Sequence, residues 1–381
     1  MLRRAQCFPG KLKSVTNACH IPDPNTVRVE RLLPASADAV RKHLAPEPCV
    51  HFELEQCGAE LLLRVTQDDI PAAATARCAA EWQARLDALA FRLRGQEPPP
   101  FPALLERYLP AYTHSFAALP EVARYTCYRA PSPIRIDGKL DDPAWQRAPV
   151  SPAFADIVTG EPAWFDTRVR MLWDDEYLYF GVSAEETDVW GTLTERDSKI
   201  YEENDLEIFI AGRDAYYEFE INALNTIYEA FWIWKDVHKP GGPYWGRPEF
   251  DPRTQRIMVL DGVGGHVHPR GERWGFLDWD CAGLKTAVHV DGTVNKRDGG
   301  DRGWSAEIAV PWASLALIAD GRSLPPQDGD VWRIDCSRFE KIGRRGETLD
   351  PCAGWTWSPH GHYDSHIPEI FPVVTFSTAR P

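Results

Sequence analysis

The sequence predicts a mainly β protein: an antiparallel β-sandwich preceded by a small α+β domain. From about residue 131 onward, short segments of alternating apolar and polar residues recur between clusters of turn-forming residues, as in sandwich folds. Fourteen of the 15 tryptophans follow residue 120, so the two parts differ in composition. A length of 381 residues also suits two domains, since domains usually contain about 100–200 residues.

The acidic charge is concentrated in the second part of the chain. Residues 1–120 contain 14 basic and 13 acidic residues, whereas the remainder contains 28 basic and 43 acidic residues. Such an acidic surface would repel nucleic acid and anionic membranes, so we expect neither as a partner. No run of about 18 apolar residues is present to span a membrane.

The first part is expected to contain strands on either side of a short helix. Residues 1–26 have no clear periodicity and are predicted to be a loop or disordered lead-in. A strand is predicted over Val27–Leu33, followed by a helix with Ser36 as its N-cap. His51–Thr66 is predicted to form two strands joined at Gly58.

A long amphipathic helix is predicted over Pro71–Arg94. Its apolar residues recur at spacings of three and four, and Gly95 is a suitable C-terminal stop. Pro98–Pro102 and residues 113–130 are predicted to be linkers. The apolar stripe consists of Ala79, Trp82, Leu86, Leu89 and Leu93.

Residues 27–112 resemble the START-like superfamily, in particular proteins similar to the activator of the heat-shock protein 90 ATPase. The matching pieces are Val27–Arg31 with Pro34–Ala37, the helix segment Trp82–Leu89, and Leu104–Tyr112. The family has several more strands between its first helix and its last strand, where this chain has only Ala45–Pro48. A shortened START-like domain is therefore expected, without the strands that would wall a ligand cavity.

The second part is predicted to consist of short strands with one buried face each. The tryptophans within these strand patterns, and near them, are expected in the core. Predicted strands are Arg168–Leu172, Tyr177–Val182, Asp205–Ile210, Tyr217–Ile221, Trp304–Val310 and Trp332–Cys336. The expected core tryptophans are Trp145, Trp173, Trp304, Trp312 and Trp332.

Five ordered motifs make residues 131–381 resemble family 9 carbohydrate-binding modules, and specifically a family 9-like subgroup. The resemblance implies a β-sandwich that binds an oligosaccharide or polysaccharide without catalysis. The motifs are Ile134–Trp145, Leu172–Tyr179, Glu203–Ile210, Tyr217–Asn222 and Gly303–Trp312. The subgroup is indicated by Trp190–Ser198 and Asn222–Thr226.

The resemblance also implies a sugar held between two aromatic rings within a polar rim. Aromatic rings stack on the apolar face of a sugar, while polar side chains bind its hydroxyls. Trp190 and Tyr201 are the candidates on one side, and Trp355 or Trp357 on the other. The last two alternate along the chain, so one is expected to face inward and one outward. Candidates for the rim are Arg196, Glu203, Asn222 and Asn225.

These residues also have structural interpretations. Trp190 could be packed on the surface, Arg196 could pair with a neighbouring acid, and Asn222 could satisfy backbone groups at the sandwich edge.

Two groups of residues could bind a metal. Asp137, Asp141 and Asp142 form an acidic turn that could hold a structural calcium ion, as family 9 modules often do, although Asp-Gly and Asp-Pro turns also form for local reasons. His360, His362 and His366 lie near Asp364 and Glu369, and a solvated loop is favoured over a metal site there.

No catalytic signature is present, so a non-enzymatic role is favoured. Glu203, Asp205 and Glu207 lie at alternate positions of one strand and should line one sheet face, which suits a polar binding surface or acid–base chemistry. Two alternatives stay open: a glycoside hydrolase on the same sandwich, and a START-like protein that interacts with a chaperone.

The nine cysteines show no C-x-x-C spacing, and mostly reduced thiols are expected, with a disulfide within the second domain as the open alternative. The basic N-terminus lacks the apolar core of a signal peptide, which predicts a cytoplasmic protein as the chain is written. The family resemblance would instead suggest a secreted or periplasmic protein if the start site is misassigned.

Overall fold

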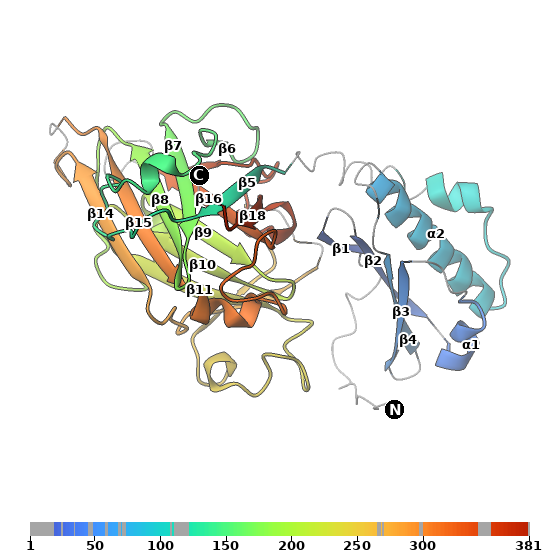
Figure 1. The fold of residues 1–381 in the computed structure, drawn as a ribbon. Helices are drawn as coiled ribbons and strands as arrows, with labels where there is room; N and C mark the ends of the chain where they lie inside the picture. Colours follow the sequence, from blue (N-terminus) through green and yellow to red (C-terminus); the bar gives the residue numbers. More distant parts are fainter. Residues whose placement is uncertain are drawn as a thin grey trace. The chain divides into compact units, whose positions relative to one another are not determined.

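A computed structural model describes most of the chain, in two compact units: residues 1–119 and 120–381 (Figure 1). The described residues are 19–23, 26–33, 35–44, 49–57, 60–67, 70, 74–106, 109, 122–264, 268, 270–296, 300–341 and 352–379. None of the described helices is long and apolar enough to cross a membrane.

The first unit contains a four-stranded antiparallel sheet with two helices, in agreement with the predicted α+β class. The sheet order is β1-β2-β4-β3. The elements are β1 (Cys19–Asp23), β2 (Thr26–Leu33), α1 (Ala37–Arg41), β3 (Val50–Cys57), β4 (Glu60–Gln67) and α2 (Thr75–Leu93). Ser36 caps α1 by accepting a hydrogen bond from the Ala39 amide at 3.4 Å, as predicted.

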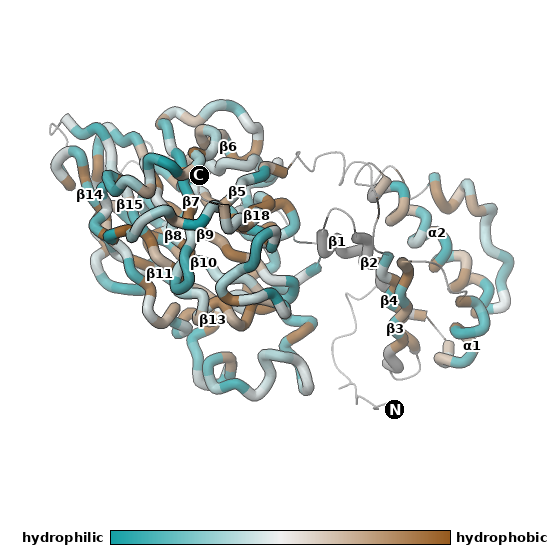
Figure 2. The backbone as a smooth tube through the Cα atoms, in the orientation of Figure 1, coloured by the Kyte–Doolittle hydropathy of each residue, from teal (hydrophilic) through white to brown (hydrophobic). Residues whose placement is uncertain are grey.

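Helix α2 packs its apolar stripe against the sheet. Ala79, Trp82, Leu86 and Leu89 share a buried cluster with strand residues such as Leu63. Figure 2 shows hydrophobic and hydrophilic stretches alternating along this helix, as expected for an element with one buried side.

Two predictions for the first unit need correction, and a third cannot be compared with the structure. Part of the predicted lead-in forms β1, because its backbone pairs with β2 (Cys19 opposite Val29). Residues 101–106 form a short helix where a linker was expected to end. The predicted helix start at residues 71–73 lies outside the described residues.

The second unit is built from one long, curled sheet of fourteen strands within the described residues. Its main path is β12-β13-β11-β10-β9-β16-β18-β5-β7-β8-β15-β14, and β17 joins β16 to the short β6. The strands are β5 (Arg124–Arg129), β6 (Ala155–Asp156), β7 (Thr167–Trp173), β8 (Tyr177–Glu185), β9 (Asp205–Ala211), β10 (Ala215–Ile221), β11 (Ile227–Trp234), β12 (Ile257–Leu260), β13 (Arg273–Phe276), β14 (Lys285–Asp291), β15 (Gly303–Pro311), β16 (Val331–Glu340), β17 (Ala353–Thr356) and β18 (Val373–Ser377).

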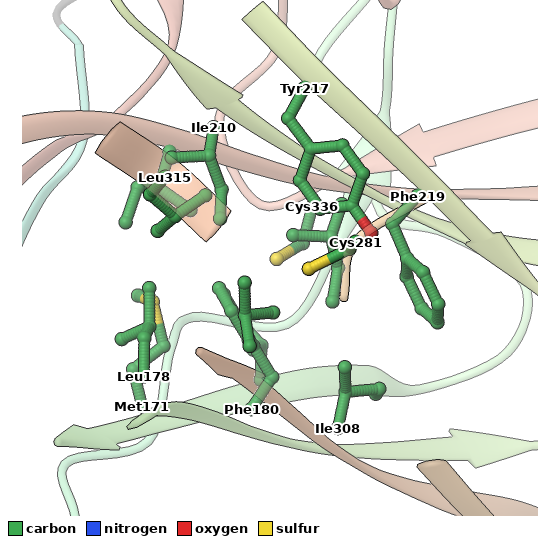
Figure 3. Packing of buried hydrophobic residues seen from close by; sticks show 14 of the residues in the cluster. Met171, Leu178, Phe180, Ile210, Tyr217, Phe219, Cys281, Ile308, Leu315 and Cys336 are labelled. Carbon is green, nitrogen blue, oxygen red and sulfur yellow. The ribbon is translucent and has the colours of Figure 1, made fainter. Parts of the chain in front are cut away.

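The two halves of this sheet face each other across the main hydrophobic core, which confirms the predicted sandwich. Ile210 and Phe219 come from the half that contains β9 and β10, whereas Phe180 and Ile308 come from β8 and β15. Figure 3 shows these two groups of side chains converging on one another. Period-two alternation therefore assigned the inward-facing residues correctly.

The predicted core tryptophans are all buried. Trp145 lies on the outer side of the β7–β8–β15 half, in a smaller cluster with Leu172 and Tyr179. Its indole nitrogen donates to Glu307 at 2.7 Å. The other four are Trp173, Trp304, Trp312 and Trp332, all in the main core.

Strand β5 corrects the predicted linker at residues 113–130. It pairs in parallel with β18 and with β7, which is an exception to the otherwise antiparallel pairing. The buried Tyr125 hydroxyl donates to the Pro149 carbonyl at 2.6 Å and accepts from the Met171 amide at 2.8 Å. The sequence pattern did not reveal this strand, because its place depends on pairing with distant segments.

The role of β5 predicts how truncated chains behave. A chain that begins at Pro120 should fold and melt at about the temperature of the second unit in the full protein. A chain that begins at Pro131 lacks β5, so it should melt at a clearly lower temperature or fail to fold. Circular dichroism melts of both chains test this, and equal melting temperatures would contradict it.

Candidate functional site

The outer face of β9 and β10 carries a strip of acidic side chains. Asp205 and Glu207 on β9 lie beside Glu218 and Glu220 on β10, and Glu207 stands directly opposite Glu220 in the strand register. All four are buried, at 5% exposure or less. This acidic strip arises because acidic residues alternate with apolar residues that point into the main core.

Two segments cover this face. The 3-10 turn Ile200–Glu202 contributes Ile200 and Tyr201, and the segment 357–371 contributes Phe371. They pack with aromatic residues of the sheet itself: Phe209, Tyr216, Tyr228 and Trp232. The acidic strip is therefore closed off from water by apolar neighbours.

Several polar groups of the face have close partners. Glu218 accepts a hydrogen bond from the Trp232 indole at 2.6 Å and lies 3.2 Å from Nε2 of His366. Glu207 accepts one from the Ser337 hydroxyl at 2.8 Å. Neither oxygen of Asp205 has a hydrogen-bond partner.

The histidine segment differs from the solvated loop that was favoured from the sequence. His360 and His366 are buried against the face. His360 lies 3.2 Å from Asp335, and Nδ1 of His366 lies 2.9 Å from the Tyr216 hydroxyl. Pairing with buried acids holds these histidines inside, an effect that their spacing in the sequence could not indicate.

Burial shifts the ionisation of the acidic strip. Burial, together with the neighbouring Glu218, raises the pKa of Glu207 to about 8. Burial and Glu207 raise the pKa of Asp205, although the Phe339 backbone acts in the opposite direction. Burial and Asp205 likewise raise the pKa of Glu220. In a dry site crowded with like charges, these carboxyls retain protons or require a cation.

Two of the predicted rim residues instead hold a neighbouring loop in place. Glu203 accepts hydrogen bonds from the amides of Thr192 and Leu193 at 2.8 and 3.2 Å. Asn222 accepts from Thr226 at 3.0 Å and donates to the Leu193 carbonyl at 3.0 Å. Both side chains are buried, so they fix the segment that follows Trp190 against the turn after β10.

The other predicted residues on this side are more accessible. Arg196 is about half exposed, contacts Glu229 and lies 2.6 Å from Asp280. Asn225 is an exposed turn residue with a left-handed φ of 62°. Trp190 is partly exposed, and so is Tyr201, whose ring meets that of Tyr228 edge-on at 5.6 Å. Glu203 and Asn222 thus both bind the backbone at Leu193, which holds the loop after Trp190 against the turn that contains Asn225.

Trp355 and Trp357 are both buried in the main core, so the expectation that one would face outward is wrong. Trp357 follows the end of β17, and its indole donates to Asp335 at 3.0 Å. The guanidinium of Arg338 lies 5.3 Å from the centre of the Trp355 ring. Strand alternation fails here because the strand ends between the two residues.

Arg338 is itself fully buried and joins several segments. It donates to Glu186 and Glu340 at 2.7 Å each, and to the Thr167 hydroxyl at 3.0 Å. Two carboxylates therefore share one guanidinium. Burial and the nearby Glu186, opposed by Arg338, raise the pKa of Glu340 to about 8.

The acidic turn predicted to bind calcium does not form one ligand set. Asp137 pairs with Arg135 at 2.5 Å, and Asp142 accepts a hydrogen bond from the Arg135 amide at 2.8 Å. Asp141 is exposed. Over the described part of the chain, the acidic or metal-binding side chains that come within 4.8 Å of one another in a group of three are Asp205, Glu207 and Glu220.

Comparison with known proteins identifies part of the second unit. Residues 136–230 match the family described as carbohydrate family 9 binding domain-like. Residues 136–230 of the second unit are therefore similar to this family. The match spans the loop after Trp190 and the acidic strands, and it lies outside residues 27–112, whose START-like resemblance is not supported. No curated protein matches the sequence.

The solved structures that match this chain in a structural comparison have low sequence identity to it. A candidate carbohydrate-binding protein from Bacteroides uniformis has 12% identity and a TM-score of 0.44, over 68% of this chain and all of its own. A family 9 module from Caldicellulosiruptor kristjanssonii in complex with cellotriose has 13% identity and a TM-score of 0.39, over 67% of this chain and 94% of its own. A family 9 module from the same organism in complex with glucose has 12% identity and a TM-score of 0.38, over 67% of this chain and 96% of its own.

Glu218, Glu220 and His366 belong to the polar face, although the sequence did not predict them there. The signal for the two glutamates was present, because both alternate with apolar residues along the predicted strand Tyr217–Ile221. This alternation predicts that the two glutamates share one side of the strand. It does not predict that this side is buried as well.

Burial of Trp355 predicts a loss of stability when its side chain is removed. Trp355→Ala should lower the free energy of unfolding of the second unit by about 3–5 kcal/mol, because it opens a cavity in the core. Trp164→Ala is the control: Trp164 is 69% exposed, and its loss should change stability by no more than about 0.5 kcal/mol. Urea unfolding of both variants measures the difference, and equal effects would contradict the assignment.

The raised pKa of the buried Glu340 carboxyl predicts that stability depends on pH. The folded protein keeps a proton on Glu340 up to about pH 8, whereas the unfolded chain loses it near the ordinary pKa of 4.5. The folded state thus binds more protons between these values, so the free energy of unfolding should fall as pH rises from about 4.5 to 8. Glu340→Gln should reduce this slope, and the exposed Glu202→Gln should not. Urea unfolding between pH 4.5 and 8 measures the slope of the free energy of unfolding against pH. An equal slope in the parent protein and in Glu340→Gln would refute the prediction.

Proposed function

We propose that the second unit binds carbohydrate through the loop and turn around Trp190, without catalysing a reaction. The observation that carries this proposal is the family match over residues 136–230, which includes that loop and the strands that hold it. The loop is fixed before any ligand arrives, since Glu203 and Asn222 bind its backbone. A preformed site loses less conformational entropy on binding.

The accessible groups have the chemistry that a sugar needs. Trp190 offers part of an aromatic face, and Arg196 and Asn225, on the same loop and on the turn after β10, have accessible polar side chains. Glu203 and Asn222 act in this proposal as positioning residues, because their polar atoms are occupied by the loop and turn backbone. Trp355 and Trp357 are not part of the proposed site.

Binding to a glycan array, followed by calorimetry with the best oligosaccharide, tests the proposal. Trp190→Ala should weaken binding by about 2 kcal/mol or more if the indole is a central stacking residue. Its melting temperature should change little, because the side chain is partly exposed.

The exposed tryptophans provide matched controls. Trp164→Ala and Trp245→Ala remove indoles that are 69% and 49% exposed, and both variants should bind the sugar like the parent protein. Unchanged binding in Trp190→Ala would refute the proposed site. Release of reducing sugar from the bound oligosaccharide would instead support a glycoside hydrolase.

A further inference from the structure

Arg273 is a buried cation on the outer face of the second unit. It begins β13, opposite Trp234 on β11 and Leu260 on β12 in the strand register. The next residue, Trp274, packs against the main core, so strand alternation turns Arg273 to the outer face. Arg273 is completely buried there.

The guanidinium of Arg273 has no hydrogen-bond partner. Its nitrogens Nε, Nη1 and Nη2 are all buried and all lack an acceptor. An arginine side chain cannot be deprotonated in a protein, so it cannot become neutral as a buried carboxyl can. Buried donors in folded proteins nearly always have an acceptor, and these nitrogens therefore indicate a ligand.

The contacts that Arg273 makes do not balance its charge. Its guanidinium carbon lies 5.1 Å from the centre of the Trp234 ring. Burial raises the pKa of Tyr216, and Arg273 acts in the opposite direction, so the two side chains are close together. An aromatic ring and a neutral phenol offset only part of the cost of burying a full charge.

The other basic groups beside Trp234 have acids of their own. The His268 ring lies 4.5 Å from the Trp234 ring between centroids, and the guanidinium carbon of Arg270 lies 5.0 Å from the centre of that ring. His268 pairs with Glu369 at 3.0 Å, and Arg270 pairs with Asp214 at 2.7 Å. The positive charge of Arg273 is thus added to a region that is already basic.

Two further acids lie near Tyr216, and both bind other groups. Glu218 lies 3.2 Å from Nε2 of His366. Asp364 accepts hydrogen bonds from the amides of Val263 and His366 at 3.1 and 2.8 Å. Within the part of the chain that the structure describes, no carboxylate accepts a hydrogen bond from Arg273. One positive charge is therefore left to be balanced.

We propose that Arg273 binds a small monovalent anion such as chloride on the outer face of β11 and β13. A single negative charge balances the single guanidinium, whose N–H groups donate charge-assisted hydrogen bonds to it. Trp234 and Leu260 surround the position with apolar groups. A dianion such as sulfate would lose more hydration there and would leave an excess negative charge.

The anion would have a structural role. It would allow a charged side chain to remain in the layer that covers the sheet, and it would stabilise the folded state in which alone its site exists. None of these residues belongs to the loop and turn around Trp190, so the anion site can be tested independently of sugar binding.

The experiment uses the full chain in chloride-free sodium gluconate, whose anion is too large for a buried site. Replacing gluconate by chloride at constant ionic strength should raise the melting temperature, and this effect should saturate as a single site fills. Line broadening in chlorine NMR measures binding directly, and bromide should compete for the site. Tighter binding of sulfate than of chloride would contradict a site for a monovalent anion.

Arg273→Met removes the charge and keeps a long apolar side chain. It should weaken chloride binding roughly tenfold or more and abolish the difference in melting temperature between chloride and gluconate. The variant should fold, because it removes an unpaired buried charge, and circular dichroism checks this.

Arg322→Met is the matched control. The guanidinium carbon of Arg322 also lies over a tryptophan, 4.1 Å from the centre of the Trp332 ring, but Arg322 pairs with Asp320 at 3.0 Å. This variant should keep the chloride response of the parent protein. A parent protein without a saturable response, or an equal response in Arg273→Met, would overturn the proposal.

A crystal of the parent protein grown in bromide decides the question if Arg273→Met fails to fold. Anomalous scattering from a bromide ion at the Arg273 guanidinium would support the site. The absence of such a signal at Arg273 would overturn it.

Discussion

Burial of acidic side chains on the outer face of β9 and β10 is the constraint on which the second unit depends. The inward residues of these strands form the sandwich core, so the alternate acidic residues necessarily share one outer face. Carboxylates that are removed from water must be compensated by hydrogen bonds, by protonation or by ions of opposite charge. The aromatic residues and the segment 357–371 exclude water from it. His366 pairs with Glu218 of this face, and His360 pairs with Asp335 on the neighbouring strand β16.

A second polar group links the two halves of the sandwich at their junction. Arg338 on β16 reaches Thr167 on β7 and the Glu185 carbonyl at the end of β8. Its planar guanidinium donates to several acceptors at once and also lies over Trp355, which a lysine could not reproduce. The contact with this buried guanidinium is one of those that hold Trp355, which was expected at a binding surface, in the core.

The region around Trp190 combines a rigid base with an accessible edge. Its backbone is held by buried polar side chains, whereas Arg196, Asn225 and part of the indole face outward. Glu203 and Asn222, which the sequence predicted as sugar-binding rim residues, therefore support the loop backbone. A polar side chain that can accept two hydrogen bonds is suited both to binding a sugar and to holding a loop backbone. Only the burial of the side chain distinguishes these two roles.

The sequence by itself determined the features that depend on neighbours along the chain. The cap at Ser36, the positions of β7 to β10, β15 and β16, and the inward residues of β9 and β10 follow from local hydrogen bonding and from period-two alternation. Tertiary structure alone decided the place of β5, the burial of Trp355 and Trp357, and the pairing of His360 and His366 with acids. Each of these depends on partners tens to hundreds of residues away, and packing between distant strands has no local signal in the sequence.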